Sequence, residues 1–120
     1  MSTLEDNDFC KAVERCLDEG WTTIFCFGAF GGRMDQTLSG MHYSEKYSRM
    51  YPELEIVLLG QSNMMFHLKK NIKYRIRIAE DIVSRFGCGI ITFGQAENVE
   101  TTGFKWNLGK DFKYSQMEWG

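Results

Sequence analysis

The segment TTIFCFGAFGGRMDQ, residues 22–36, decides the fold of the first half of this 120-residue chain. Its first part, Thr22–Phe27, is β-branched and aromatic, apolar on both faces and bounded by glycine, which is typical of a buried strand in a parallel sheet. The glycine-rich stretch Gly28–Gly32 then predicts a tight loop. Apolar residues recur at helical spacing from Met34 onward. A strand, a loop and a helix in this order indicate an α/β unit.

The sequence on either side of this segment extends the same pattern. Asp6–Asp8 offers N-cap side chains for a first helix, and Gly20 fits the left-handed cap that ends it. Tyr51-Pro52 closes the second helix, because the residue before proline avoids helical geometry. Glu55–Leu59 is another short apolar strand, so the order is half of a parallel α/β sheet. The apolar helix positions are Phe9, Ala12, Val13, Cys16, Leu17, Met34, Leu38, Met41 and Tyr43.

The second half of the sequence indicates β-structure throughout. Strands are expected over 63–68, over the alternating segment 73–78, over the apolar segment 88–93 and over the alternating segment 99–108. Short strands separated by glycine turns predict an antiparallel β-sandwich. We place the break between the halves near 66–72 and the two domains at 1–68 and 69–120.

Composition and charge exclude several classes of protein. The net charge of −2 gives no support to nucleic-acid binding, which needs a broad basic face. That charge is divided unevenly, at −5 for residues 1–60 and +3 for residues 61–120. The longest apolar stretches fall far short of the roughly 20 residues of a membrane span. The four cysteines form no CxxC pair, and no signal peptide precedes them, so we expect reduced thiols and a cytoplasmic protein.

The residues that carry chemistry gather in GAFGGRMDQ, residues 28–36. This loop joins a strand to a helix, at the carboxyl end of the strand, where open α/β sheets bind ligands. Glycines let backbone N–H groups approach phosphate oxygens at a helix N-terminus. Arg33 can hold phosphate through two hydrogen bonds, and Asp35 can bind Mg²⁺. The spacing matches neither a Walker A motif nor a Rossmann fingerprint. A plain turn in which Asp35 serves the helix dipole is the alternative.

GAFGGRMDQ, together with ETTGFKWNL at residues 100–108, resembles the thiamine pyrophosphokinase family. That family carries a G-G-x-x-G-R-x-D-Q loop in its catalytic domain and a T-T-G-L-K-W-N-L strand in its thiamine-binding domain. The resemblance implies a Rossmann-like α/β catalytic, nucleotide-binding domain over 1–68 and a β-sandwich thiamine-binding domain over 69–120, both partial. It also implies a homodimer that transfers diphosphate from ATP to thiamine with Mg²⁺, releasing AMP, without nucleic-acid or membrane partners.

The resemblance assigns roles to individual residues. It implies ATP-binding positions at Gly28, Gly31, Gly32, Arg33 and Gln36, with Arg33 as the phosphate clamp. Asp35 is the first catalytic and Mg²⁺-binding carboxylate. Asp8 is the second, because Asp8-Phe9 matches the end of the family's D-x-D-x-T-D-F motif. Trp106 matches the tryptophan that stacks on thiamine. From its position after a strand end, Asn63 is a further candidate for nucleotide contact.

Departures from the family pattern leave two functions open. Only the last acid of D-x-D-x-T-D is kept, and an upstream G-D-x-D-S motif has no counterpart in the chain. We therefore expect a partial member of the family, without the N-terminal part and the last strands. The first function is the diphosphate transfer itself, with the activity of this truncated form open. The second is a non-catalytic remnant that binds thiamine or a partner subunit.

Overall fold

The fold is taken from a computed structural model, which describes residues 7–81, 87–92, 95–96, 98–104, 107–109 and 117–118. Contacts divide the chain into two units, Met1–Arg75 and Ile76–Gly120. The assignment of a catalytic domain to 1–68 and a thiamine-binding domain to 69–120 stays a prediction. None of the helices in the described part of the chain is long and apolar enough to cross a membrane.

The first unit begins with helix α1, Asp8–Asp18, whose two ends are closed by local hydrogen bonds. The side chain of Asn7 accepts a hydrogen bond from the backbone N–H of Cys10 at 2.8 Å. At the other end Gly20 adopts a φ of +84°, and the N–H of Trp21 donates to the carbonyl of Cys16. The hydrogen bonding at this C-terminal end, together with the positive φ of Gly20, forms a Schellman motif, which confirms the predicted glycine cap.

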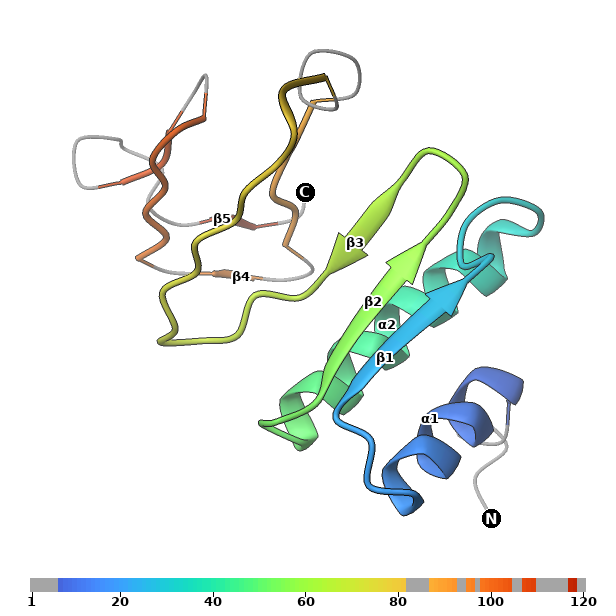
Figure 1. The fold of residues 1–120 in the computed structure, drawn as a ribbon. Coiled ribbons are helices and arrows are strands. Elements are labelled where there is room, and N and C mark those ends of the chain that lie inside the picture. The colour runs from blue at the N-terminus through green and yellow to red at the C-terminus, as the bar shows by residue number, and fades with distance from the viewer. Residues whose placement is uncertain are drawn as a thin grey trace. The chain divides into compact units, whose positions relative to one another are not determined.

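A mixed three-stranded sheet follows, built from β1 (Thr23–Phe27), β2 (Glu55–Leu59) and β3 (Met64–Phe66) in that spatial order. The predicted parallel pairing of the first two strands is confirmed, with Ile24 opposite Ile56 and Cys26 opposite Leu58. β3 pairs with β2 in the antiparallel sense. Helix α2, Met34–Met50, connects β1 to β2 and lies against the sheet (Figure 1). The expected α/β organisation of the first half is therefore present.

The core lies on one face of this sheet, between the strands and both helices. The hydroxyl of Tyr47 on α2 donates to Glu14 on α1 at 3.0 Å, which ties the helices together. The buried core residues are Cys10, Val13, Tyr43, Tyr47, Leu54, Ile56 and Leu58.

Two predictions about burial are wrong. β1 is not buried on both faces, because the helices pack on one face only and Phe25 and Phe27 on the other face are 59% and 80% exposed. On α2 the apolar positions Met34 and Leu38 are exposed. Tyr43 from the same predicted set is buried, and the buried face also contains Ser44, Tyr47 and Ser48.

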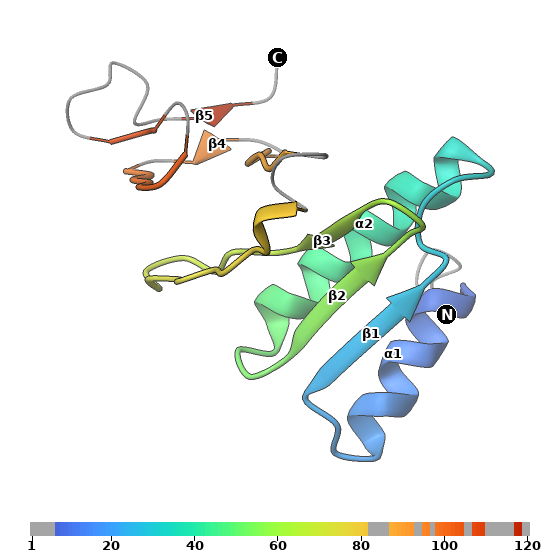
Figure 2. The same ribbon diagram turned by 45° about the horizontal axis from the view of Figure 1, so that its top comes forward.

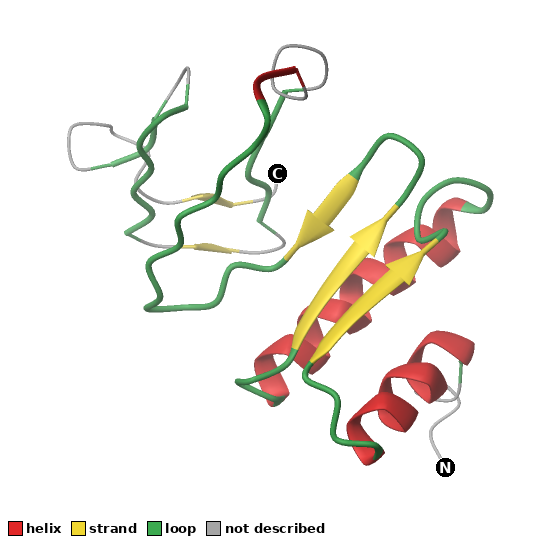
Figure 3. Ribbon diagram, in the orientation of Figure 1, coloured by secondary structure: helices red, strands yellow, loops and turns green. Residues whose placement is uncertain are grey.

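The second unit contains two short antiparallel strands in its described residues, β4 (Gln95–Ala96) and β5 (Met117–Glu118). Figure 3 shows loop for most of the described chain after β3. The strands predicted over 73–78 and in the described parts of 88–93 and 99–108 are wrong. An alternating pattern makes a strand only where a partner strand accepts its hydrogen bonds. The β-sandwich stays a prediction.

The segment 99–108 gives the clearest reason for such a correction. The backbone N–H of Thr101 donates to the carbonyl of Leu108 at 2.8 Å. A strand would hold those two residues about 23 Å apart, at roughly 3.3 Å per residue. The chain therefore turns back on itself between Thr101 and Leu108 and forms a closed loop.

Candidate functional site

The candidate site lies at the carboxyl ends of β1 and β2, where the loop Gly28–Gly32 leads into α2. Because the strands are parallel, both end at the same edge of the sheet (Figure 1). The N–H of Ala29 donates to the carbonyl of Leu59 at 3.1 Å, which fixes the start of the loop to the end of β2. This is the edge at which α/β sheets place their ligands.

The loop glycines are required by backbone conformation and not by crowding. Gly31 and Gly32 have φ values of +96° and +66°, a region that residues with a side chain rarely adopt. A Cβ added to either would meet no atom within 4 Å. The loop therefore presents its backbone to open space, as a phosphate-binding loop requires.

The N-terminus of α2 receives no capping hydrogen bond from the side chain of its N-cap residue. Its N-cap, Arg33, makes no side-chain capping bond, whereas α1 is capped by Asn7. The first N–H groups of a helix carry a partial positive charge and favour anionic ligands. The hydroxyl of Thr37 donates to the carbonyl of Arg33 at 3.3 Å.

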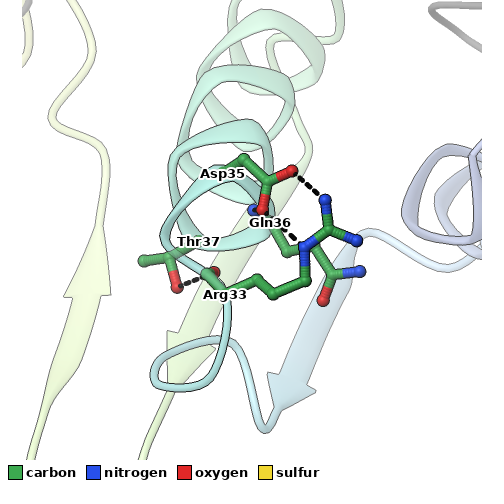
Figure 4. Close-up of polar contacts among 4 residues, drawn as sticks. All are labelled: Arg33, Asp35, Gln36 and Thr37. Atoms are coloured by element: carbon green, nitrogen blue, oxygen red, sulfur yellow. Dashed lines mark hydrogen bonds and ion pairs between the residues drawn. The ribbon is translucent and has the colours of Figure 1, made fainter.

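Three of the predicted site residues meet in this first turn (Figure 4). Arg33 holds Asp35 through two hydrogen bonds, Nη2–Oδ2 at 2.6 Å and Nε–Oδ1 at 3.1 Å. The backbone N–H of Gln36 also donates to Asp35 Oδ1, at 3.0 Å. The side chains of Arg33 and Asp35 are 73% and 64% exposed. The ion pair between Arg33 and Asp35 is therefore exposed to solvent beside the glycine loop.

A hollow of about 350 Å³ opens next to the loop. Phe30 also lines a second hollow, of about 260 Å³. Asn63, the predicted nucleotide-binding residue, lines the second hollow. Its backbone carbonyl accepts a hydrogen bond from the N–H of Gly60. Its nucleotide contact stays a prediction. The first hollow is lined by Phe27, Gly28, Phe30, Leu59, Gly60 and Gln61.

Sequence reasoning missed the aromatic part of this site. Phe27 and Phe30 line the same hollow, three residues apart, because the loop turns between them. The signal was an aromatic residue placed between glycines in Gly28–Gly32, where solvation alone favours a polar side chain.

The second predicted acid, Asp8, is the first residue of α1 and is exposed. α1 runs opposite to β1, so its N-terminal end lies toward the carboxyl ends of the strands (Figures 1 and 2). Among the residues that the structure describes, no group of three or more His, Cys, Asp or Glu side chains is placed to hold a metal. The chemistry of Asp35 still fits Mg²⁺, which takes one or two protein carboxylates and fills its other positions with phosphate oxygens and water.

A serine and a histidine meet elsewhere in the first unit, without the exposure that a nucleophile needs. Ser44 Oγ lies 2.8 Å from His67 Nε2, and Ser44 is fully buried. The hydroxyl donates to the carbonyl of Met41 at 3.0 Å, so it accepts from the imidazole. Burial lowers the pKa of His67, although Glu45 and the Met41 carbonyl act in the opposite direction. The pair joins the end of β3 to α2.

In the second unit, polar residues of ETTGFKWNL hold the loop 101–108 closed. Thr101 Oγ1 accepts from the N–H of Leu108 at 2.8 Å and donates to Asn107 Oδ1 at 3.2 Å. Asn107 Oδ1 also accepts from the N–H of Phe104, at 2.9 Å. The loop carries Trp106, the predicted thiamine residue, which lies outside the described residues. Sequence reasoning did not predict the roles of Thr101 and Asn107 in closing the loop.

Comparison with known proteins adds an independent line of evidence. Residues 73–119 match the family model described as "Thiamin pyrophosphokinase, vitamin B1 binding domain". The chain is 33% identical over 86 residues to "Thiamine pyrophosphokinase 1" of Oryza sativa subsp. japonica, covering 71% of the chain and 31% of that protein. It is 31% identical over 102 residues to "Thiamine pyrophosphokinase 2" of the same plant, covering 82% of the chain and 36% of that protein.

No solved structure shows a significant match to the chain. The chain spans about a third of the length of the two rice proteins. The matched model covers the segment that contains ETTGFKWNL, and the rice sequences extend the similarity over most of the chain. On this evidence the chain belongs to the thiamine pyrophosphokinase family, as a partial member.

Proposed function

We propose that this chain takes part in the transfer of diphosphate from ATP to thiamine, giving thiamine diphosphate and AMP. The observation that carries the proposal is the combination of two features in one chain. An open glycine loop with Arg33 and Asp35 stands at the ligand edge of a parallel strand pair. A vitamin B1-binding sequence follows over residues 73–119. The proposal includes the Rossmann-like and β-sandwich folds, the homodimer and the cytoplasmic location expected above.

The resting ion pair is suited to exchange with a polyphosphate. An exposed salt bridge contributes about 0–1 kcal/mol, so a ligand that attracts Arg33 more strongly can open it. Arg33 would then hold phosphate oxygens through its two N–H groups. The uncapped N-terminus of α2 and the backbone of Gly31 and Gly32 would bind the same oxygens. Asp35 is freed by this exchange.

The reaction is a displacement at phosphorus. The hydroxyl oxygen of thiamine forms a bond to the β-phosphorus of ATP, and the bond from that phosphorus to the oxygen of the α-phosphate breaks, releasing AMP. Such transfers depend mainly on positioning and charge stabilisation. Arg33 neutralises charge on the transferred group, and Asp35 or Asp8 accepts the hydroxyl proton. Mg²⁺, when bound with ATP, would supply further charge stabilisation, and Asp35 in the first turn of α2 would be its carboxylate ligand.

A second function has support of its own. The matched family model covers the vitamin B1-binding domain, and the described residues bring no acidic cluster together. A chain that binds thiamine, or a partner subunit, without transferring diphosphate would show these same features.

One assay separates the two functions. The purified chain is incubated with ATP, Mg²⁺ and thiamine, while AMP and thiamine diphosphate are measured by chromatography. AMP release that requires thiamine supports the transferase. Thiamine binding by calorimetry without AMP release supports the non-catalytic function. A chain that neither binds thiamine nor releases AMP would contradict the transferase and the thiamine-binding function, and would leave only binding to a partner subunit.

A further inference from the structure

We propose that the hollow beside the glycine loop binds the heterocyclic base of the nucleotide, an inference that rests on the proposed function. The hollow measures about 350 Å³, within the usual range of small-molecule sites. It is open toward solvent at the carboxyl ends of β1 and β2. Phe27 and Leu59, the last residues of these strands, are register partners and both line it.

The hollow lies next to the glycine loop, so one ligand can contact both. Gly28 is both a lining residue of the hollow and the first residue of the loop Gly28–Gly32. A nucleotide whose phosphates lie at the loop and the N-terminus of α2 therefore has its other end within reach of the hollow. With the base bound in the hollow, Arg33 and Asp35 would remain available to the phosphates.

The chemistry of the lining favours a neutral planar heterocycle. None of the six lining residues is charged. Phe27 and Phe30 offer aromatic surface, and the amide of Gln61 can both donate and accept a hydrogen bond at the edge of a base. The cationic ring of thiamine would find no counter-charge in the hollow. A nucleobase therefore fits the lining better than thiamine does.

Gly60 fixes the wall of the hollow. A Cβ added at position 60 would lie 2.8 Å from Phe30 Cδ2 and 3.2 Å from Phe30 Cβ. These distances leave no room for a side chain, so Phe30 holds its place only because residue 60 is glycine. Phe30 lines both the larger hollow and the smaller hollow, which Met41, Met64 and Met65 also line. Gly60 is a positioning residue that acts through Phe30.

A pair of matched variants tests the proposal. Phe27→Ala removes a lining ring, and Phe25→Ala removes a ring from the same exposed face of the same strand, outside the hollow. Calorimetry measures the affinity of the chain and both variants for Mg²⁺–ATP and for Mg²⁺–tripolyphosphate, which has no base. By the strength of base stacking, Phe27→Ala should weaken ATP roughly tenfold to a hundredfold and leave tripolyphosphate unchanged. Phe25→Ala should change neither affinity.

Gly60→Ala provides a second variant, one that keeps the side chains of Phe27, Phe30 and Gln61 in the sequence. It should displace Phe30 and weaken ATP more than tripolyphosphate. The proposal would be overturned by equal effects of Phe27→Ala and Phe25→Ala, by an equal loss of both ligands, or by a loss of thiamine binding in Phe27→Ala with ATP binding intact. Binding of neither phosphate ligand by the unmodified chain would overturn the proposed function as well. Tripolyphosphate binding with no preference for ATP would overturn the base site alone.

Discussion

Arg33 and Asp35 bind each other across the first turn of α2, through Nη2–Oδ2 at 2.6 Å and Nε–Oδ1 at 3.1 Å. Both side chains are mostly exposed, so the pair contributes little to folding. Because the pair lies beside the glycine loop, we relate it to ligand binding and not to stability. Each partner neutralises the other, and under the proposed function a ligand that separates them would find a cation for its phosphates and a carboxylate for Mg²⁺ or for a hydroxyl.

Asp35→Asn should abolish thiamine-dependent AMP release while leaving the fold intact. The amide keeps the shape of the side chain but removes the charge that Mg²⁺ or the hydroxyl proton requires. Arg33 loses its partner at the same time, so binding of tripolyphosphate should persist or strengthen. AMP release and calorimetry measure the two effects.

Glu19→Gln is the matched control for this variant. It removes the charge from another exposed arginine–carboxylate ion pair, Arg15–Glu19 at 3.1 Å, at the end of α1. It should change neither AMP release nor phosphate binding. Full activity of Asp35→Asn with unchanged dependence on Mg²⁺ would remove Asp35 from the site.

Thr101→Val should open the loop 101–108. Valine keeps the shape of threonine but loses the oxygen that accepts from Leu108 and donates to Asn107. Each lost hydrogen bond costs about 0.5–1.5 kcal/mol. Hydrogen exchange at the amides of Phe104 and Leu108 should therefore become faster, and Thr101→Ser should restore the slow exchange. Unchanged exchange in Thr101→Val would mean that the hydroxyl does not hold the loop.

The first unit was largely predictable because its signals are local. Asn7 and Gly20 act on backbone groups within a few residues, so their capping roles follow from sequence alone. The same holds for the loop Gly28–Gly32 between a strand and a helix. The face on which each element is buried depends on distant partners. Ser44 and Ser48 are buried on α2 although they are polar, and Phe25 is exposed on β1 although it is apolar.

The second unit was harder because alternation does not identify a hydrogen-bonding partner. The segment 73–78 alternates like a half-buried strand, yet it is not in a strand. In 99–108 the polar residues Thr101 and Asn107 bond within the segment and close it into a loop. The hollow at Phe27 and Phe30 was missed for a similar reason, since it depends on Gly60, thirty residues further along the chain.

Acid should destabilise the first unit through His67. Burial lowers the pKa of this imidazole, while an unfolded chain takes up its proton near pH 6.5. Below that pH the unfolded state binds more protons than the folded state, so the free energy of unfolding falls as the pH falls. The attraction of Glu45 for the proton opposes part of the effect. Urea unfolding between pH 7.5 and 5.5 measures it.

The two histidines of the chain provide the comparison for this effect. His67→Gln should flatten the pH dependence, because the titrating group is gone. His42→Gln, at an exposed position on α2, should keep the slope of the unmodified chain. An equal slope in all three proteins would show that His67 does not control the response to acid.

Trp106→Ala should separate the two ligands of the proposed enzyme. Stacking on an aromatic platform is worth about 1–3 kcal/mol by analogy with base stacking, so thiamine affinity should fall roughly tenfold to a hundredfold. ATP affinity should stay nearly unchanged, because the glycine loop belongs to the first unit. Trp21→Ala, an exposed tryptophan in that unit, is the control and should affect neither ligand. Calorimetry with both ligands decides the matter, since an equal loss of thiamine and ATP in Trp106→Ala would mark Trp106 as a residue needed for folding and not for stacking.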